Sequence, residues 1–385
     1  MKRLLWAAMG LALASSGRAE ETIKVGVIAP FSGPFADYGR EMEAGIKAYM
    51  KIHGDGVAGK KVAVILKDTT GPAPDVAKRL AQELVVREKV DFLAGFGLTP
   101  EALAAADIAT QAKKPMVVMN AATSVITAKS PYIARVSMTL SQETAPLATW
   151  AAKNGIKRVF TLVSDYGPGI DSETAFKKGF AAAGGQIVDS VRVPLKNPEF
   201  APFTQRIKDR RPEAVFVFLP AGEQGIAFMK AFQERGLGEA GIKAIATGDV
   251  TDDHVIDAMG EVALGMITSS HYSAAHDSAE NKTFLEAYDE VSGGLGRANF
   301  MAVAAYDGMA AIYGVVQKLD GKIDGDRAME VLKGWKRESP RGPILIDRET
   351  RDIVQTIYIR RVEKRGGRYY NIEFDQFPAV KDPGK

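Results

Sequence analysis

Short apolar runs alternate with stretches of helical periodicity along the first third of the chain. The runs are nearly continuous, which is typical of parallel strands covered on both faces. They span Ile23–Ile28, Val62–Leu66, Phe92–Gly95 and Met116–Met119. Between them, apolar residues recur at the three- and four-residue spacing of an amphipathic helix. Regular alternation of strand and helix predicts a doubly wound α/β lobe.

The same alternation restarts near residue 158. Strands with helices between them are predicted over Arg158–Val163, Ile187–Val193, Ala214–Leu219 and Lys243–Ala246. Two lobes of similar strand and helix content are therefore expected. Beyond Gly260 the order changes to a strand, two helices and a late strand, predicted over Gly265–Ser269, Asn281–Glu290, Met301–Lys318 and Gln355–Val362. Because this tail follows two complete lobes, the chain must cross between them several times.

Two consecutive strand ends of the first lobe lead into loops of small and hydroxyl-bearing residues. The first loop ends at Thr99, the expected N-cap of the next helix. Pro100 fits the first helical turn, and Glu101 complements the positive end of the helix dipole. The second loop is Asn120–Ser124. Backbone N–H groups beside helix starts suit a carboxylate, although threonines that only cap helices are the plainer alternative.

Six loops are expected at the carboxyl ends of the predicted strands. In open α/β sheets, ligands bind outside these ends. The loops are Pro30–Gly39, Gly97–Pro100, Asn120–Ser124, Ser164–Gly169, Pro220–Glu223 and Thr247–Asp253. Two lobes that face each other would gather all six around one cleft. We therefore predict a cleft that closes on a ligand.

The first nineteen residues have the three zones of a secretory signal peptide. Met1–Arg3 is basic, Leu4–Ala14 carries no charge, and small residues precede an expected cleavage after Ala19. The apolar run is too short to span a membrane, and no later run approaches 18 apolar residues. We therefore predict that residues 1–19 are a signal peptide and that the mature protein is free in the periplasm.

Composition narrows the class of protein further. The chain has 385 residues, 46% hydrophobic and 25% charged, which is typical of a globular protein with room for two cores. Its formal charge of +3 falls to about zero without the signal peptide, since Lys2, Arg3 and Arg18 are lost. Nucleic acid is therefore not an expected partner. The absence of cysteine from the sequence excludes disulfides and a thiol nucleophile.

Enzyme signatures are weak or absent in the sequence. It contains no Walker A motif, no G-x-S-x-G elbow and no H-E-x-x-H. His271 and His276 are expected in a solvated loop rather than at a metal. One acidic cluster is expected to begin a helix rather than hold a cation; it comprises Asp249, Asp252 and Asp253. We expect no cofactor and no metal, and a hydrolase is a distant alternative.

Four segments together resemble the periplasmic binding proteins of the branched-chain amino acid type, the substrate-capture components of ABC importers. They are Ile23–Gly39, Met119–Ser124, Ser164–Gly169 and Ala304–Gly308. The resemblance implies a type I periplasmic binding protein fold, with two doubly wound α/β lobes joined by a three-segment hinge. The crossings are expected near Ser137–Ser141, Thr268–Ser273 and Ile346–Ile353. Lobe one would comprise residues 22–139 plus 272–348, and lobe two residues 140–271 plus 349–385.

The resemblance also implies how one end of a ligand is held. In this family the substrate carboxylate is bound by a hydroxyl residue after the fourth strand and by the backbone and hydroxyl of an A-x-T loop. Thr99 matches the first position, and Ala121 with Thr123 matches the second. Leu98, beside Thr99, is a further candidate contact.

The far end of the ligand is expected to meet the second lobe. Tyr166 matches a tyrosine that contacts the ligand, and Asp249 matches an acidic residue that binds the amino group in amino-acid binders. Tyr38 and Phe300 are expected to flank a ring. The chain departs from the family near Pro220–Gly222, where a common aromatic is missing, and at Asp249, where Glu is more usual. Both departures disfavour an α-amino ligand.

The sequences of several loops resemble those of the subset of this family that captures aromatic acids from lignin breakdown. The function implied is periplasmic capture of a benzoate, hydroxybenzoate or vanillate type of acid by hinge closure. The protein is expected to be a monomer that delivers its ligand to ABC permease subunits in the inner membrane. Two alternatives stay open, namely a binding protein for branched-chain or other amino acids and a ligand sensor of the same fold.

Overall fold

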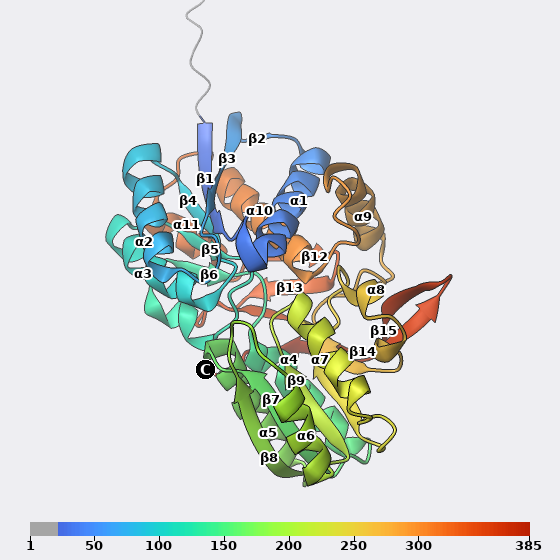
Figure 1. The fold of residues 1–385 in the computed structure, drawn as a ribbon. Helices are drawn as coiled ribbons and strands as arrows, with labels where there is room; N and C mark the ends of the chain where they lie inside the picture. Colours follow the sequence, from blue (N-terminus) through green and yellow to red (C-terminus); the bar gives the residue numbers. More distant parts are fainter. Residues whose placement is uncertain (1–21) are drawn as a thin grey trace, which may run out of the picture.

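The computed structural model describes residues 22–385. The predicted signal peptide, residues 1–19, lies outside the described residues. The described chain forms two α/β lobes, one above the other, each built on its own sheet (Figure 1). We call the parts around the first sheet, residues 22–135 and 279–332, lobe 1. The parts around the second sheet, residues 140–270 and 336–380, are lobe 2.

Lobe 1 contains a six-stranded sheet in the order β2-β3-β1-β4-β5-β6. Its strands are β1 (Thr22–Ala29), β2 (Gly56–Val57), β3 (Lys60–Asp68), β4 (Phe92–Gly95), β5 (Met116–Val118) and β6 (Ile133–Arg135). All neighbours pair in parallel except β2 with β3. The helices are α1 (Ala36–His53), α2 (Pro74–Glu83), α3 (Thr99–Ala112), α9 (Ala279–Val291), α10 (Phe300–Lys318) and α11 (Gly325–Leu332), with the short turns η1 (Gly33–Phe35), η2 (Leu84–Glu88) and η3 (Ser124–Lys129). Three of the four apolar runs are buried parallel strands, as predicted. The fourth, β3, is parallel but only half-buried, with Leu66 37% exposed.

Helix α10 forms the centre of lobe 1. It packs against α1 so closely that a Cβ atom on Gly45 would lie 2.0 Å from the Ala302 carbonyl oxygen, which explains glycine at this position. By length and a mean hydropathy of 1.2, α10 could span a membrane, but 89% of that stretch is buried inside the protein. A helix that is apolar on all faces is typical of a core position.

Lobe 2 contains a nine-stranded mixed sheet in the order β12-β13-β14-β11-β10-β9-β7-β8, with β15 paired to β14. Its strands are β7 (Arg158–Ser164), β8 (Gln186–Val193), β9 (Ala214–Phe218), β10 (Lys243–Thr247), β11 (Ile267–Ser270), β12 (Lys336–Ser339), β13 (Gly342–Ile346), β14 (Ile353–Arg365) and β15 (Arg368–Val380). The helices are α4 (Leu140–Lys153), α5 (Gly167–Ala182), α6 (Ala201–Arg210), α7 (Glu223–Glu234) and α8 (Ile256–Met259), followed by η4 (Gly260–Ala263). β7 to β11 pair with one another in parallel. The pairs that involve β12 to β15, including β14 with β11, are antiparallel.

The chain passes between the lobes at three places. It leaves lobe 1 after β6, returns after β11, and leaves again between α11 and β12. The first two places agree with the predicted crossings, whereas the predicted third crossing, Ile346–Ile353, joins β13 to β14 within one sheet. The exact lobe boundaries stay a prediction, and one detail differs: residues 336–346 were assigned to lobe one but hydrogen-bond into the second sheet.

A buried arginine ties these crossings together. Arg341 is 1% exposed, and its guanidinium contacts Asp307 at 2.9 Å and the Ser137 carbonyl at 3.1 Å. A third contact joins it to the Gln355 side chain at 2.8 Å. A charge removed from water is tolerated only when it is paired and hydrogen-bonded, as it is here. The hinge therefore has a polar centre that connects α10, the first crossing and β14.

Candidate functional site

Loops from both lobes enclose a small cavity at the carboxyl ends of the strands. The free space inside it is small, about 10 Å³, because the loops of the two lobes stand close together. Lobe 1 and the first crossing contribute Tyr38, Gly97, Leu98, Thr99, Asn120, Ala121, Ala122 and Met138, and lobe 2 contributes Leu140, Tyr166, Pro168, Phe218 and Asp249. Six of the eight predicted site residues therefore line one cavity.

Thr99 lines the cavity from lobe 1, and the Thr123 hydroxyl lies beside the Thr99 hydroxyl, outside the cavity lining. Thr99 Oγ1 and Thr123 Oγ1 lie 3.0 Å apart, and both residues are buried. Thr123, the seventh predicted residue, thus lies next to the cavity and is hydrogen-bonded to Thr99. Helix α3 begins at Thr99, so its N–H has no acceptor within the helix. Two hydroxyls and a helix start can together bind an anion.

The prediction that Thr99 is the N-cap of α3 is wrong by one residue. Leu98 occupies the cap, and its backbone N–H donates to Glu101 Oε2 at 3.1 Å. The other carboxylate oxygen, Glu101 Oε1, accepts from Thr69 Oγ1 at 2.5 Å. Burial raises the pKa of Glu101 to about 7. Because Glu101 fixes the helix start, the Thr99 hydroxyl is available to the cavity.

The loop after β5 is fixed by its own hydrogen bonds, and this corrects the role expected for Ala121. The Ala121 N–H donates to the Phe96 carbonyl at 2.9 Å, so it cannot also donate to a ligand. Asn120 holds the facing loop, because its Nδ2 donates to the Gly97 carbonyl at 2.7 Å. Ala121 therefore shapes the cavity wall, and the hydroxyls and the helix start supply the donors.

Aromatic rings form two walls of the cavity. Tyr38 stands on the lobe 1 side, edge-on to Phe35 with 5.4 Å between ring centroids, and its hydroxyl donates across the cleft to the Ala221 carbonyl at 3.4 Å. On the lobe 2 side, Tyr166 stacks on Phe218 with 6.1 Å between centroids and 21° between planes. Burial raises the pKa of both tyrosines well above the ordinary value, so both are neutral donors.

Phe218 was missed by the sequence analysis. It lies at the end of β9, before the segment Pro220–Gly222 in which a family aromatic was found missing. The signal was the last residue of a predicted strand, since residues at that end face the cleft. An aromatic side chain therefore does line the cavity here, two residues before Pro220.

Asp249 lines the cavity from lobe 2, in the loop after β10. It is 6% exposed, and its Oδ2 accepts from Thr247 Oγ1 at 3.0 Å. Burial, followed by the nearby Glu143 carboxyl, raises the pKa of Asp249 to about 8. At neutral pH the Asp249 side chain is therefore mostly protonated, and it can donate as well as accept a hydrogen bond.

The two lobes approach each other closely beside Thr123. A Cβ atom built on Gly167, the first residue of α5, would lie 2.5 Å from Thr123 Oγ1. Nearby, the Ser124 N–H donates to Asp171 Oδ2 of α5 at 2.9 Å. Only glycine permits this approach of lobe 2 to the threonine pair without a shift. The structure therefore describes a closed cleft.

Phe300 is not brought to the cavity. It begins α10, is 5% exposed, and packs edge-on against His271 with 5.9 Å between ring centroids. Phe300 is not among the residues that line this cavity, so its contact with a bound ring stays a prediction. Because α10 is apolar on nearly every face, its sequence gave no indication of which residue would face the site.

The histidine and aspartate clusters also differ from expectation. His271 is completely buried with Nδ1 2.5 Å from Glu143 Oε1, so it does not lie in a solvated loop. His276 does lie in the loop before α9, half-buried, with Nδ1 2.8 Å from Glu373 Oε2. The cluster Asp249, Asp252 and Asp253 does not cap α8, whose N-cap is Val255. Asp252 and Asp253 are buried instead, where they accept bonds from Asn299 and Asn371. These two carboxylates therefore hold neighbouring segments together through hydrogen bonds.

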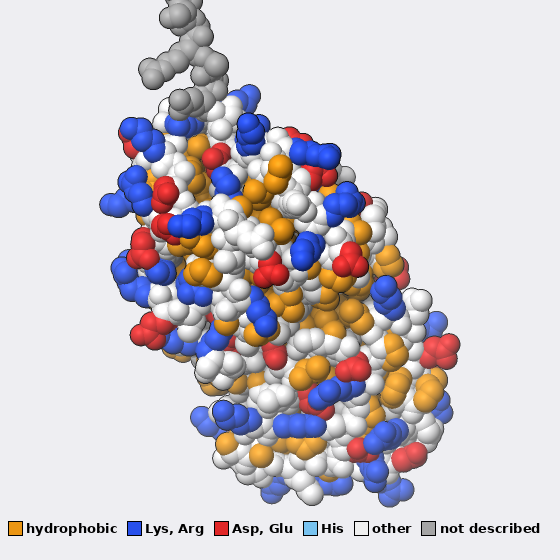
Figure 2. All heavy atoms as spheres, turned by 90° about the vertical axis from the view of Figure 1, so that its left-hand side faces the viewer, with side chains coloured by type: hydrophobic (Ala, Val, Ile, Leu, Met, Phe, Trp, Pro, Cys, Tyr) orange, Lys and Arg blue, Asp and Glu red, His pale blue; other side chains and the backbone are white. Residues whose placement is uncertain are grey.

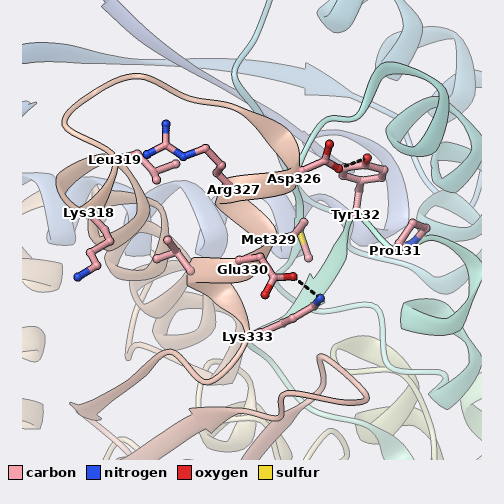
Figure 3. A pocket seen from close by; sticks show the side chains of 10 residues that line it. Pro131, Tyr132, Lys318, Leu319, Asp326, Arg327, Met329, Glu330 and Lys333 are labelled. Carbon is pink, nitrogen blue, oxygen red and sulfur yellow. Dashed lines mark hydrogen bonds and ion pairs between the residues drawn. The ribbon is translucent and has the colours of Figure 1, made fainter.

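A more open groove lies elsewhere on lobe 1 and contains no predicted site residue. Figure 3 shows its side chains, including Tyr132, which bonds Asp326 at 2.5 Å, and Glu330, which pairs with Lys333 at 2.6 Å. Tyr132 precedes β6, so the groove lies at the amino end of that strand, opposite the edge where the six loops meet. Its position argues against a ligand site of this fold.

Two α/β lobes with an enclosed cavity at their strand ends define a binding protein of the type I fold. The chain belongs to the periplasmic binding protein family, whose sequence profile matches residues 22–368. The resemblance seen in the sequence is thereby confirmed, and so is the fold that it implied.

Solved structures similar to this chain include solute-binding proteins from Rhodopseudomonas palustris. One from strain BisB5, in complex with 3,4-dihydroxybenzoic acid, is 57% identical with a TM-score of 0.92 over 95% of this chain and 99% of that one. Another from strain HaA2, in complex with p-hydroxybenzoic acid, is 47% identical with a TM-score of 0.93 over 94% and 99%. A curated relative, the Leu/Ile/Val-binding protein homolog 6 of Brucella melitensis, is 47% identical over 100% of this chain and 99% of its own.

Proposed function

We propose that this protein is the solute-binding component of an ABC importer and that it captures an aromatic carboxylic acid of the benzoate, hydroxybenzoate or vanillate type. The observation that carries the proposal is the composition of the enclosed cavity. A hydroxyl pair at one end is matched to a carboxylate, stacked aromatic side chains are matched to a ring, and a buried acid at the other end is matched to a ring hydroxyl. The two Rhodopseudomonas complexes support the same ligand class.

The magnitudes are sufficient for useful affinity. Burial of about 150 Å² of aromatic surface is worth roughly 4 kcal/mol. Two or three hydrogen bonds to a carboxylate add about 1.5 to 3 kcal/mol each before the cost of association. A micromolar dissociation constant requires about −8 kcal/mol, which lies within this range.

The second candidate is a branched-chain amino acid, which the name of the Brucella relative favours. Asp249 would then be ionised and would bind the α-ammonium group. The cavity argues against this, because burial and Glu143 already favour the neutral form of Asp249. The flat aromatic pair of Tyr166 and Phe218 also fits a ring better than a branched aliphatic chain.

Calorimetric titration with benzoate, 4-hydroxybenzoate and leucine tests the proposal. The aromatic acids should bind in the micromolar range or tighter, with leucine much weaker. Native mass spectrometry of protein purified without unfolding should show a co-purified species of matching mass. Tighter binding of leucine than of either aromatic acid, together with its loss in Asp249→Ala, would establish the amino-acid function instead.

Ligand capture should be coupled to closure of the cleft. The lobes meet through Tyr38 and Ala221, through Ser124 and Asp171, and through His254 Nδ1, which lies 3.1 Å from Glu41 Oε1. Small-angle scattering should show a smaller radius of gyration with ligand, and the free energy of unfolding should rise by about 2.7 kcal/mol at a hundredfold excess over Kd. An unchanged radius at saturation would argue for a rigid protein.

The proposed setting is the periplasm, where a monomer would exchange ligand with permease subunits of the inner membrane. The family and the signal peptide predicted over residues 1–19 support this location. On the face drawn in Figure 2, basic and acidic side chains are interspersed over both lobes, which fits a protein without a nucleic-acid partner. Fractionation that finds the intact Met1 form in the cytoplasm would overturn this location.

A further inference from the structure

The residues after β15 return from lobe 2 to the carboxylate end of the site. β15 ends at Val380, and residues 381–385 reach the start of η3 in lobe 1, at the lobe junction marked C in Figure 1. Ser124 Oγ donates to Asp382 Oδ1 at 3.0 Å, and both residues are buried. Because Ser124 directly follows Thr123, this segment contacts the loop whose Thr123 hydroxyl lies 3.0 Å from the Thr99 hydroxyl.

A second route joins the same segment to Thr123. Lys385 Nζ donates to Thr127 Oγ1 at 2.8 Å and lies 3.2 Å from Asp352 Oδ2. Asp352 Oδ1 lies 3.3 Å from Arg135 Nε, and both of these side chains are almost completely buried. Arg135 Nη2 in turn donates to the Thr123 carbonyl at 2.7 Å. Charge-assisted contacts therefore lead without a gap from Lys385 to the backbone of Thr123.

We propose that residues 382–385 are positioning residues for the carboxylate-binding loop, residues 120–124. The segment is anchored on lobe 2, where Gln142 Nε2 donates to the Val380 carbonyl at 2.7 Å, and it holds Thr123 through Ser124 and Arg135. It thereby fixes the Thr123 hydroxyl relative to Thr99. This inference rests on the proposed function in one respect only, that the threonine pair binds a carboxylate.

The physical reason is the precision that a binding site demands. Donors held within about 0.5 Å of the productive geometry bind far better than donors on a loose loop. Three of the elements that hold residues 120–124 come from distant parts of the chain, through Arg135, Asp171 and Asp382. Loss of the Asp382 contact should therefore weaken every carboxylate by a similar factor and leave the choice among ring substituents unchanged.

The test compares Asp382→Ala, Asp382→Asn and the control Lys381→Ala; the Lys381 side chain is 71% exposed and pairs with Asp347. The probes are benzoate, 4-hydroxybenzoate and leucine. Asp382→Ala should raise Kd about tenfold for every carboxylate that the parent protein binds, with the ratio of the two aromatic affinities unchanged. Asp382→Asn should restore binding, since its amide oxygen accepts from Ser124. Lys381→Ala should bind like the parent, with equal ligand-free melting midpoints for all three variants.

A Kd for Asp382→Ala within about twofold of the parent would overturn the inference, and so would an asparagine variant as weak as the alanine variant. If Asp382→Ala fails to fold, Ser124→Ala removes the same hydrogen bond and carries the same expectation. If leucine is the ligand that the parent binds, the aromatic function fails while the effect of Asp382→Ala on leucine still decides the positioning role. A parent protein that binds no carboxylate overturns both.

Discussion

The lobe 1 end and the lobe 2 end of the candidate cavity differ in what they offer a ligand. At the lobe 1 end, the donors are uncharged hydroxyls beside the start of a 14-residue helix. At the lobe 2 end, stacked aromatic rings lead to a buried acid whose pKa is raised to about 8. Under the proposed function, the first end would meet the group that all carboxylates share, and the second would meet the part in which they differ. Affinity and selectivity should therefore be separable by mutation.

The largest effect is expected at the shared end. Thr123→Ala removes a hydrogen bond to a charged group and should weaken benzoate and 4-hydroxybenzoate alike by about 1 to 3 kcal/mol. The measurement is calorimetric titration of both acids, with Thr283→Ala on the exposed face of α9 as a control. A loss of affinity for only one of the two acids would mean that the lobe 1 end also distinguishes between ring substituents.

An intermediate effect is expected at Asp249. Asp249→Ala should weaken 4-hydroxybenzoate by about 1.5 kcal/mol, since a neutral hydrogen bond is lost, and should change benzoate little. Titration of the two acids against this variant gives the difference directly. Equal losses for both acids would show that Asp249 acts on the whole cavity rather than on a ring hydroxyl.

Asp249 should also impose a pH dependence. Because its pKa is raised to about 8, the side chain gains a negative charge as the pH rises through 8, so the affinity for benzoate should fall between pH 7 and 9. Between the ordinary carboxyl pKa and about 8, native Asp249 holds a proton that the unfolded chain has lost. Its contribution to the free energy of unfolding should therefore also fall as the pH rises through this range. Asp249→Asn should flatten the binding profile, and a profile as steep as that of the parent would exclude Asp249 as the source.

The smallest effect is expected from the aromatic wall. Phe218→Leu keeps an apolar surface but removes the stack on Tyr166, which should cost about 0.5 kcal/mol for aromatic acids, because the rings are 6.1 Å apart. Phe200→Leu is the matched control, since Phe200 packs on Phe228 away from the cavity. Competition titration resolves the difference. If the control weakens binding equally, the loss comes from lobe 2 stability.

The lobe 1 end could be predicted because its chemistry is local. Thr99 and Thr123 follow buried strands, and strand ends of a parallel sheet meet at one edge. The expectation that the Ala121 N–H binds the ligand was wrong, because this N–H donates to the Phe96 carbonyl. The spacing of residues in the sequence does not reveal such a tertiary hydrogen bond. The capping of α3 failed similarly, because Glu101 and Thr69 fix the helix start from another segment.

Lobe 2 was harder to predict beyond its parallel strands. β12 and β15 are rich in charged and polar residues, and α4 carries Pro146 in its interior, so their patterns do not match a buried strand or a regular helix. The third crossing was misplaced for the same reason, since β12 was not recognised. The position of Phe300 was hard to predict for the opposite reason, because an almost entirely apolar helix has no distinct face.

The contact of Gly167 with Thr123 bears on how long a ligand stays. With no side chain at Gly167, nothing at this point can swing aside to open an exit while the lobes remain together. Rotamer changes occur in picoseconds to nanoseconds, but separation of whole lobes takes microseconds to milliseconds. The residence time of a bound acid should then follow the frequency of lobe opening, so that release becomes a property of the hinge rather than of the pocket.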